Sequence, residues 1–323
     1  MRFVELGKTG IRVSMIGIGT WQWGAKEWGY EKSYSEIEVR KAFKAIYENE
    51  INFIDTAEMY AFGKSEKLVG EMVREYGREN FVIATKVSPW HLDEKSLEKA
   101  CQGSLERLGI KEIDLYQVHW PNPLVPISKT MKALEKLLNF GKIRAIGVSN
   151  FNLKQLSNAR KHLEKNDIAS DQVLYNMLSR NVEKDLIPYA QKEKITLIAY
   201  SPLAQGLLSG KITSSYKPKE IVRKINPLFS KSNIKKLETL NSVLQNIAKS
   251  KGKTVTQVVL SWTMRHGCVV PIPGVKNDNQ VRDVAESVSI SLSNEELNTI
   301  ELALKNTRVN KLLGYLEVIL NFT

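Results

Sequence analysis

The chain has 323 residues, of which 42% are hydrophobic and 25% are charged, and this composition excludes a disordered or collagen-like protein. Its net charge of +12 comes with lysines spread over most expected outer helices, so we expect solvated helix faces and no nucleic acid partner, with an anion-attracting mouth as the second interpretation. Cys101 and Cys268 stand alone and no apolar run is long enough to span a membrane, which favours a cytoplasmic protein with no metal site and no membrane association.

The first expected element is a β-hairpin, because the stretch FVELGKTGIRVS alternates around the turn residues Lys8, Thr9 and Gly10. Eight short apolar or β-branched runs follow, and each is typical of a buried strand. The runs are residues 15–20, 51–56, 81–87, 113–119, 143–149, 170–176, 196–201 and 268–273.

Helix signals fill the gaps between these runs. Ser35 and Glu38 form a capping-box pattern, and Gly109 is a typical C-terminal stop. The gap before the eighth run is about twice as long as the others and holds a long loop and two helical stretches, residues 235–250 and 254–267.

Strands that are buried on both faces and alternate with helices pair in parallel through right-handed crossovers. Eight such units predict an α/β protein with a single (β/α)8 TIM barrel, whose floor the N-terminal hairpin caps. No low-complexity linker interrupts the chain, so we expect one domain over residues 1–323. The apolar tail, residues 312–322, is expected to pack on the barrel or on a partner.

Catalytic groups of such barrels come from the C-terminal ends of the strands. That rule selects Asp55, Tyr60, Lys86 and His119, although each alone has an ordinary explanation as a cap, a packing residue or a solvated charge. Together they can reduce an aldehyde or ketone: the Lys86 ammonium lowers the pKa of the Tyr60 phenol, which gives the proton. Asp55 holds Lys86 charged, and His119 donates a hydrogen bond to the carbonyl oxygen.

The sequence resembles the aldo/keto reductase family over nearly the whole chain and in the family's order. The stretches that match are LGKTGIRVSMIGIGTW, FIDTAEMY, ATKV, VHWP, GVSNF, QVLYN, YSPLAQGLLSGK and PIPGVK. The resemblance places the family's Asp, Tyr, Lys and His tetrad on the four residues above. It implies a (β/α)8 barrel with a nicotinamide cofactor, usually NADPH, extended across the mouth.

The resemblance also implies the cofactor contacts. Those expected to bind the carboxamide are Ser149, Asn150 and Gln172, and Tyr200 would stack on the nicotinamide ring. Those expected along the pyrophosphate are Ser201, Pro202, Leu203, Gln205 and Gly206. At the other end, Lys276 would pair with the 2′-phosphate, Gln280 would contact the adenine and Arg282 would add charge, so NADPH is preferred over NADH.

Two departures from the family pattern stand out. Ala61 follows the catalytic tyrosine where the family usually has glycine, so the loop backbone is expected to differ slightly. Val284 stands where an asparagine often contacts the adenine.

Four tryptophans lie at or just past strand ends: Trp21, Trp23, Trp90 and Trp120. Packing in the core and walling an apolar substrate pocket are equally good interpretations of each. If they line the pocket, aromatic or aliphatic carbonyl compounds should bind better than sugars.

Two functions stay open. The leading one is an NADPH-dependent reductase of small carbonyl compounds, and the alternative is a cofactor-binding regulatory subunit similar to potassium-channel β subunits. The sequence leaves the physiological substrate, the direction of the reaction and the role of the tail undecided, and it is compatible with a homo-oligomer.

Overall fold

Eight parallel strands form one sheet in the computed structural model, which describes residues 1–307, 309, 310 and 312. Their order in the sheet follows their order in the chain, and every strand predicted from the sequence is confirmed. The strands are β3 (Ile18–Gly19), β4 (Phe53–Asp55), β5 (Val82–Val87), β6 (Leu115–Val118), β7 (Ile146–Ser149), β8 (Ile168–Leu174), β9 (Thr196–Tyr200) and β10 (Val269–Ile272).

The sheet closes between its first and last strands. The amides of Gly17 and Gly19 donate to the carbonyl oxygens of Pro271 at 3.0 Å and Pro273 at 3.1 Å, and Gly19 pairs in parallel with Gly274. A Cβ atom on Gly19 would lie only 3.0 Å from the carbonyl oxygen of Ile272, so this close approach favours glycine. The predicted (β/α)8 barrel is therefore confirmed.

The predicted hairpin consists of β1 (Phe3–Glu5) and β2 (Arg12–Ser14), which pair antiparallel. The amide of Gly7 in its turn donates to Thr196 Oγ1 at 2.9 Å, at the first residue of β9. Leu6 and Val13 are fully buried against the lower barrel interior, in one cluster with Phe53. The hairpin thus closes the barrel at the N-terminal ends of the strands, which leaves the opposite end open for a site.

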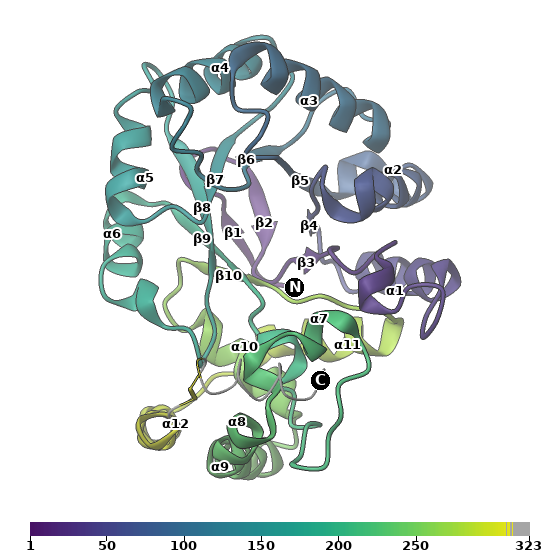
Figure 1. The fold of residues 1–323 in the computed structure, drawn as a ribbon, viewed down its shortest axis with the longest axis vertical. Helices are drawn as coiled ribbons and strands as arrows, with labels where there is room; N and C mark the ends of the chain where they lie inside the picture. Colours follow the sequence, from purple (N-terminus) through teal and green to yellow (C-terminus); the bar gives the residue numbers. More distant parts are fainter. Residues whose placement is uncertain (308, 311, 313–323) are drawn as a thin grey trace.

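The helices between β3 and β9 lie around the outside of the strands (Figure 1). They are α1 (Glu36–Glu48), α2 (Lys64–Tyr76), α3 (Glu94–Leu108), α4 (Ile127–Asn139), α5 (Leu153–Arg160) and α6 (Leu186–Glu193). The capping box of Ser35 and Glu38 begins α1 as predicted, and Gly109, with φ of 65°, ends α3.

The helices that follow β9 lie together on one side of the barrel (Figure 1). They are α7 (Ile221–Lys224), α8 (Lys231–Lys236), α9 (Glu238–Ser250), α10 (Val255–Met264), α11 (Asp278–Glu286) and α12 (Asn294–Asn306). The single helix expected over residues 235–250 is wrong at its start, because a turn at the fully buried Leu237 separates α8 from α9.

Short 3-10 helices connect several of these elements: η1 (Lys26–Trp28), η2 (Tyr60–Gly63), η3 (Arg78–Asn80), η4 (Asn181–Glu183), η5 (Ala204–Gly206), η6 (Pro227–Phe229) and η7 (Ser287–Ser289). In the described part of the chain no helix is both long and apolar enough to cross a bilayer. The expectation for the tail falls outside the described residues, apart from Leu312.

Candidate active site

A cavity of about 840 Å³ opens at the C-terminal ends of the strands. It runs from the expected catalytic residues to Lys276 and Gln280. The predicted residues that line it are Trp21, Asp55, Tyr60, His119, Trp120, Ser149, Asn150, Gln172, Tyr200, Ser201, Pro202, Leu203, Gln205, Gly206, Lys276 and Gln280. Those outside its lining are Trp23, Lys86, Trp90 and Arg282.

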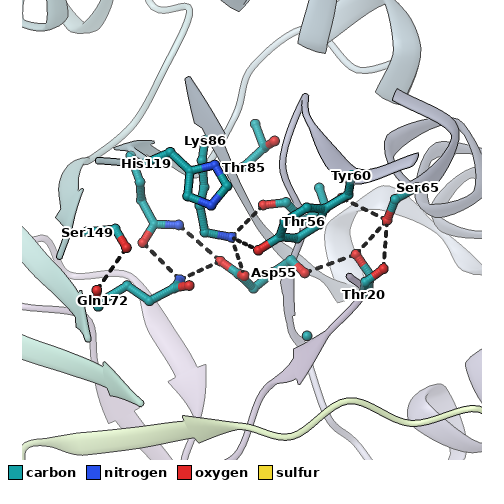
Figure 2. Close-up of polar contacts among 12 residues, drawn as sticks. Thr20, Asp55, Thr56, Tyr60, Ser65, Thr85, Lys86, His119, Ser149 and Gln172 are labelled. Carbon is teal, nitrogen blue, oxygen red and sulfur yellow. Dashed lines mark hydrogen bonds and ion pairs between the residues drawn. The ribbon is translucent and has the colours of Figure 1, made fainter. Parts of the chain in front are cut away.

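Lys86 lies just behind the cavity wall, where it joins Asp55 to Tyr60 (Figure 2). Its ammonium donates to Asp55 Oδ1 at 2.5 Å, to the backbone oxygen of Thr56 at 2.8 Å and to the phenol oxygen of Tyr60 at 3.1 Å. Asp55 ends β4 and Lys86 lies on β5, so the register of neighbouring strands sets this spacing. Lys86 has no exposed surface, and its three acceptors satisfy the buried ammonium.

Side chains on two further strands donate hydrogen bonds to the second carboxylate oxygen of Asp55. Gln117 Nε2 on β6 donates to it at 3.0 Å, and Gln172 Nε2 on β8 donates at 2.8 Å. Gln172 also donates to Gln117 Oε1 at 3.2 Å. The sequence analysis missed Gln117, although its place two residues before His119 in an alternating strand put it on the same face.

The charges at this cluster follow from burial and ion pairing together. Burial opposes the charge on Lys86, but Asp55 and Tyr60 outweigh it and raise the lysine pKa. Burial is also the largest influence on Tyr60, and the net pKa of its phenol is raised, since the lowering by Lys86 offsets burial only in part. Lys86 therefore lowers the phenol pKa as expected, but burial raises this pKa by more, and Tyr60 stays protonated at neutral pH.

His119 directly follows β6 and stands edge-on to Tyr60, with ring centroids 5.7 Å apart and an angle of 77° between the planes. Burial, aided by the Lys86 charge, lowers the pKa of His119 to about 3. The imidazole is therefore neutral near pH 7, with one N–H that can donate a hydrogen bond. Its Nδ1 atom is buried with no hydrogen-bond partner in the described part of the chain.

The loop after Tyr60 has an unusual backbone. Ala61 and Phe62 both have left-handed conformations, with φ of 47° and 54°, and Gly63 follows with φ of 84°. A non-glycine residue in this region costs on the order of 1 kcal/mol or more. The substitution of the family's glycine by Ala61 thus adds strain beside the phenol without moving the phenol from Lys86.

The expected carboxamide contacts form a connected chain across β7, β8 and β9. Asn150 Nδ2 donates to the backbone oxygen of His119 at 3.1 Å and to Ser149 Oγ at 3.0 Å. The hydroxyl of Tyr200 donates to Asn150 Oδ1 at 3.0 Å, and Ser149 Oγ donates to the backbone oxygen of Gln172 at 2.8 Å. These bonds hold the polar side chains of three strand ends in place at the cavity wall.

The far end of the cavity carries the expected phosphate-binding lysine. Lys276 Nζ donates to the backbone oxygen of Trp28 at 2.8 Å and lies 3.4 Å from Glu220 Oε1. Arg282 does not join it. Arg282 lies outside the cavity lining and pairs with Asp278, one turn earlier on α11, because residues four apart share a helix face.

Arg223 of α7 lines the cavity in its place. Its Nε donates to the backbone oxygen of Gln205 at 3.0 Å, and its NH1 donates to the hydroxyl of Tyr216 at 2.9 Å. The sequence analysis missed Arg223 because it lies in the long insertion after β9, where basic residues are frequent and no periodicity marks a site.

Two of the four tryptophans line the cavity. Trp21 packs edge-on against Trp28 at 5.1 Å between ring centroids and lies 6.4 Å from the Tyr60 ring. Trp120 is 48% exposed and also lines the cavity. Trp28 completes this aromatic wall and was not singled out from the sequence.

The other two tryptophans lie elsewhere. Trp23 is fully buried: its indole N–H donates to the backbone oxygen of Val275 at 2.8 Å and its ring packs on Phe43. The turn after β3 directs Trp23 into the core, so the pocket-wall interpretation is wrong for this residue. Trp90 is 75% exposed outside the lining of the cavity, so the same interpretation is not supported for it.

Among the described residues, no group of three or more His, Cys, Asp or Glu side chains is placed to hold a metal ion.

Comparisons with known proteins agree with this geometry. A model of the aldo/keto reductase family matches residues 15–305. The chain is 35% identical over 319 residues to the aldo-keto reductase YhdN of Bacillus subtilis, covering 95% of each chain. It is 31% identical over 322 residues to the NADH-specific methylglyoxal reductase of Escherichia coli, covering 92% of this chain and 96% of that one.

Among solved structures, an aldo-keto reductase from Klebsiella pneumoniae in complex with NADPH is 32% identical, with a TM-score of 0.76 over 96% of this chain and 97% of that one. The family match covers the strands that carry the tetrad and the stretch that carries Lys276. The chain therefore belongs to the aldo/keto reductase family.

Proposed function

We propose that this protein reduces small aldehydes or ketones to alcohols with NADPH, and that Tyr60 gives the proton. The observation that carries the proposal is the position of the Lys86 ammonium, 2.5 Å from Asp55 and 3.1 Å from the Tyr60 hydroxyl, beside a neutral His119 at the cavity. A protonated phenol and a neutral imidazole are the two donors that a carbonyl oxygen needs as it becomes an alkoxide.

The lining of the cavity fits a nicotinamide dinucleotide. Polar side chains that include Ser149 and Asn150 lie near the tetrad, and Lys276 lies at the far end. Burial lowers the pKa of Lys276, and its nearest anion, Glu220, is 3.4 Å away, so this cation has capacity for a closer anionic partner. When bound, the cofactor supplies the hydride that is added to the carbonyl carbon.

NADPH is preferred over NADH in this proposal because an ion pair between Lys276 and a 2′-phosphate has no counterpart in NADH. The relatives do not decide the question, since one is named for NADH and another was solved with NADPH. Arg223, on the same cavity, adds to the positive charge at that end.

The residues of the tetrad divide the work on the proton. Tyr60 donates its proton to the carbonyl oxygen, and the adjacent Lys86 ammonium stabilises the phenolate that remains. Asp55 keeps Lys86 charged and oriented, held in turn by the two glutamine amides. His119 donates a hydrogen bond that positions the substrate oxygen.

Purified protein with NADPH and a simple carbonyl compound tests the proposal through the steady loss of NADPH absorbance. Tyr60→Phe should keep NADPH binding and lose on the order of 10³-fold in turnover. Turnover by the phenylalanine variant at the wild-type rate would refute Tyr60 as the proton donor. One fast turnover with tightly retained cofactor would favour the regulatory subunit instead.

We also propose that the substrate is apolar, because two partly exposed tryptophans, Trp21 and Trp120, line the cavity and the Trp21 ring lies 6.4 Å from the Tyr60 ring. Benzaldehyde-type compounds should have kcat/KM values at least about tenfold above those of sugar aldehydes. Clearly better turnover of the sugars would reject this assignment and leave the reductase proposal standing.

A cytoplasmic location and a single domain over residues 1–323 complete the proposal. The two cysteines, Cys101 and Cys268, are both free thiols, which suits a reducing compartment.

A further inference from the structure

One carboxylate is shared by the two cations at the far end of the cavity. Glu220 Oε1 lies 3.4 Å from Lys276 Nζ, and Glu220 Oε2 lies 3.2 Å from Arg223 NH1. All three side chains line the cavity, and their exposed fractions are 16% for Glu220, 20% for Lys276 and 21% for Arg223. Glu220 thus faces the space where the proposed function places the 2′-phosphate.

The backbone around Glu220 keeps it there. Glu220 directly precedes α7, which packs against η1. The Arg223 side chain ties α7 to the backbone oxygen of Gln205, and Asn226 Nδ2 donates to Gln205 Oε1 at 3.0 Å. These contacts hold α7 in place, and Glu220, the residue before it, is part of the cavity wall.

A carboxylate in the cavity wall has opposite effects on the two nicotinamide cofactors. A 2′-phosphate carries nearly two negative charges, so it must compete with Glu220 for Lys276 and Arg223 and is repelled by Glu220 at close range. NADH presents a hydroxyl at the same place, and a carboxylate accepts hydrogen bonds from hydroxyl groups.

We propose that Glu220 is a specificity-determining residue that limits the preference for NADPH and allows NADH to bind the same site. This inference rests on the proposed function, which assigns the 2′-phosphate to Lys276. Lys276 provides the attraction for the phosphate, and Glu220 sets how much of that attraction is available.

The test compares Glu220→Gln with the wild type in binding of NADPH and NADH, measured by quenching of tryptophan fluorescence in the absence of substrate. The variant should increase the ratio of Kd for NADH to Kd for NADPH on the order of tenfold, because it removes one negative charge next to the phosphate. Glu220→Asp, which keeps the charge, should change the ratio by less than about twofold.

Glu301→Gln is the matched control, since Glu301 pairs with Arg180 at 2.7 Å away from the cavity lining. It should leave the ratio unchanged. Circular dichroism checks that each variant is folded, and Glu220→Ala, with the same expected increase, replaces Glu220→Gln if the glutamine variant does not fold.

The outcomes distinguish a failure of the role of Glu220 from a failure of the proposed function. An unchanged or decreased ratio in Glu220→Gln, with both nucleotides bound by the wild type, overturns the role of Glu220 alone. Binding of neither nucleotide by the wild type overturns the proposed function and the inference with it.

Discussion

The two ends of the cavity are built differently. At the tetrad end, Asp55 and Lys86 lie on adjacent strands, are almost fully buried and are fixed by the register of the barrel. At the phosphate end, Lys276, Glu220 and Arg223 come from loops and the short α7 and are about a fifth exposed. The difference teaches that the groups proposed to react rest on the rigid scaffold, while the groups proposed to select the cofactor rest on segments that can vary without disturbing it.

Lys86→Met should disrupt the tetrad end of the cavity and have the largest effect on activity and stability. It removes the ammonium beside Tyr60 and leaves Asp55 buried without its cation, so turnover should fall by about 10³-fold or more and stability by about 3 kcal/mol. Steady-state kinetics and urea unfolding followed by circular dichroism measure the two losses. Retention of near wild-type turnover would show that the ammonium has no part in proton transfer.

Lys276→Met should break only the loop-built end. The Kd for NADPH should rise about 10- to 100-fold while the Kd for NADH and kcat at saturating cofactor change little, because the lost ion pair exists only with the 2′-phosphate. Fluorescence titration measures both affinities. Arg282→Met is the matched control, and a loss of NADPH affinity there as large as in Lys276→Met would contradict the separation of Arg282 from the site.

Asp171→Asn tests how much the buried carboxylate of Asp171, on β8, lowers the stability of the folded protein. Asp171 on β8 is fully buried, its carboxylate oxygens have no well-formed hydrogen bond in the described part of the chain, and burial raises its pKa well above the ordinary value despite the nearby Phe151 amide. The folded state therefore holds the proton longer than the unfolded state does. Wild-type stability should fall as the pH rises from about 4 through the folded pKa.

The asparagine variant carries no such charge and should be about 1 to 3 kcal/mol more stable than the wild type near pH 7, with no gain near pH 3. Urea unfolding at a series of pH values measures this difference. A gain of the same size at every pH would show that packing, and not ionisation, separates the two proteins.

Ala61→Gly should have the smallest effect on stability. It tests the backbone strain in the residue next to Tyr60. Glycine adopts the φ of 47° without strain, so stability should rise by up to about 1 kcal/mol. Thermal unfolding measures the gain, and Ala57→Gly, at a buried position without a left-handed backbone, should lose stability instead. A loss of stability in Ala61→Gly would show that the left-handed backbone carries no strain.

The sequence predicts the strand-built end well because strands and their ends follow from local patterns. All eight strands, the hairpin and the cap of α1 are confirmed, and Asp55, Lys86 and Tyr60 meet because alternation and strand order place them on one rim. The lowering of the Tyr60 pKa by Lys86 was predicted, but the larger effect of burial was not, since the depth of burial depends on the folded surroundings and not on the neighbouring residue alone.

The sequence predicts the phosphate end less well. Arg282 and Arg223 are both basic residues in helices, and only the helix orientation decides that one pairs with Asp278 while the other reaches the cavity. Trp23 shows the same limit within a turn. Only one residue separates it from Trp21, yet the Trp21 ring lies at the cavity and the Trp23 ring lies in the core. These side-chain orientations depend on tertiary contacts, which a local sequence pattern does not contain.

Gln172 belongs both to the cavity lining and to the hydrogen-bond network of the tetrad. Its side chain lines the cavity, and its amide nitrogen donates a hydrogen bond to Asp55. Any attempt to redesign the nicotinamide half of the pocket through this position will therefore disturb the protonation machinery as well. Under the proposed function, a different cofactor preference is therefore better sought around α7 than at this glutamine.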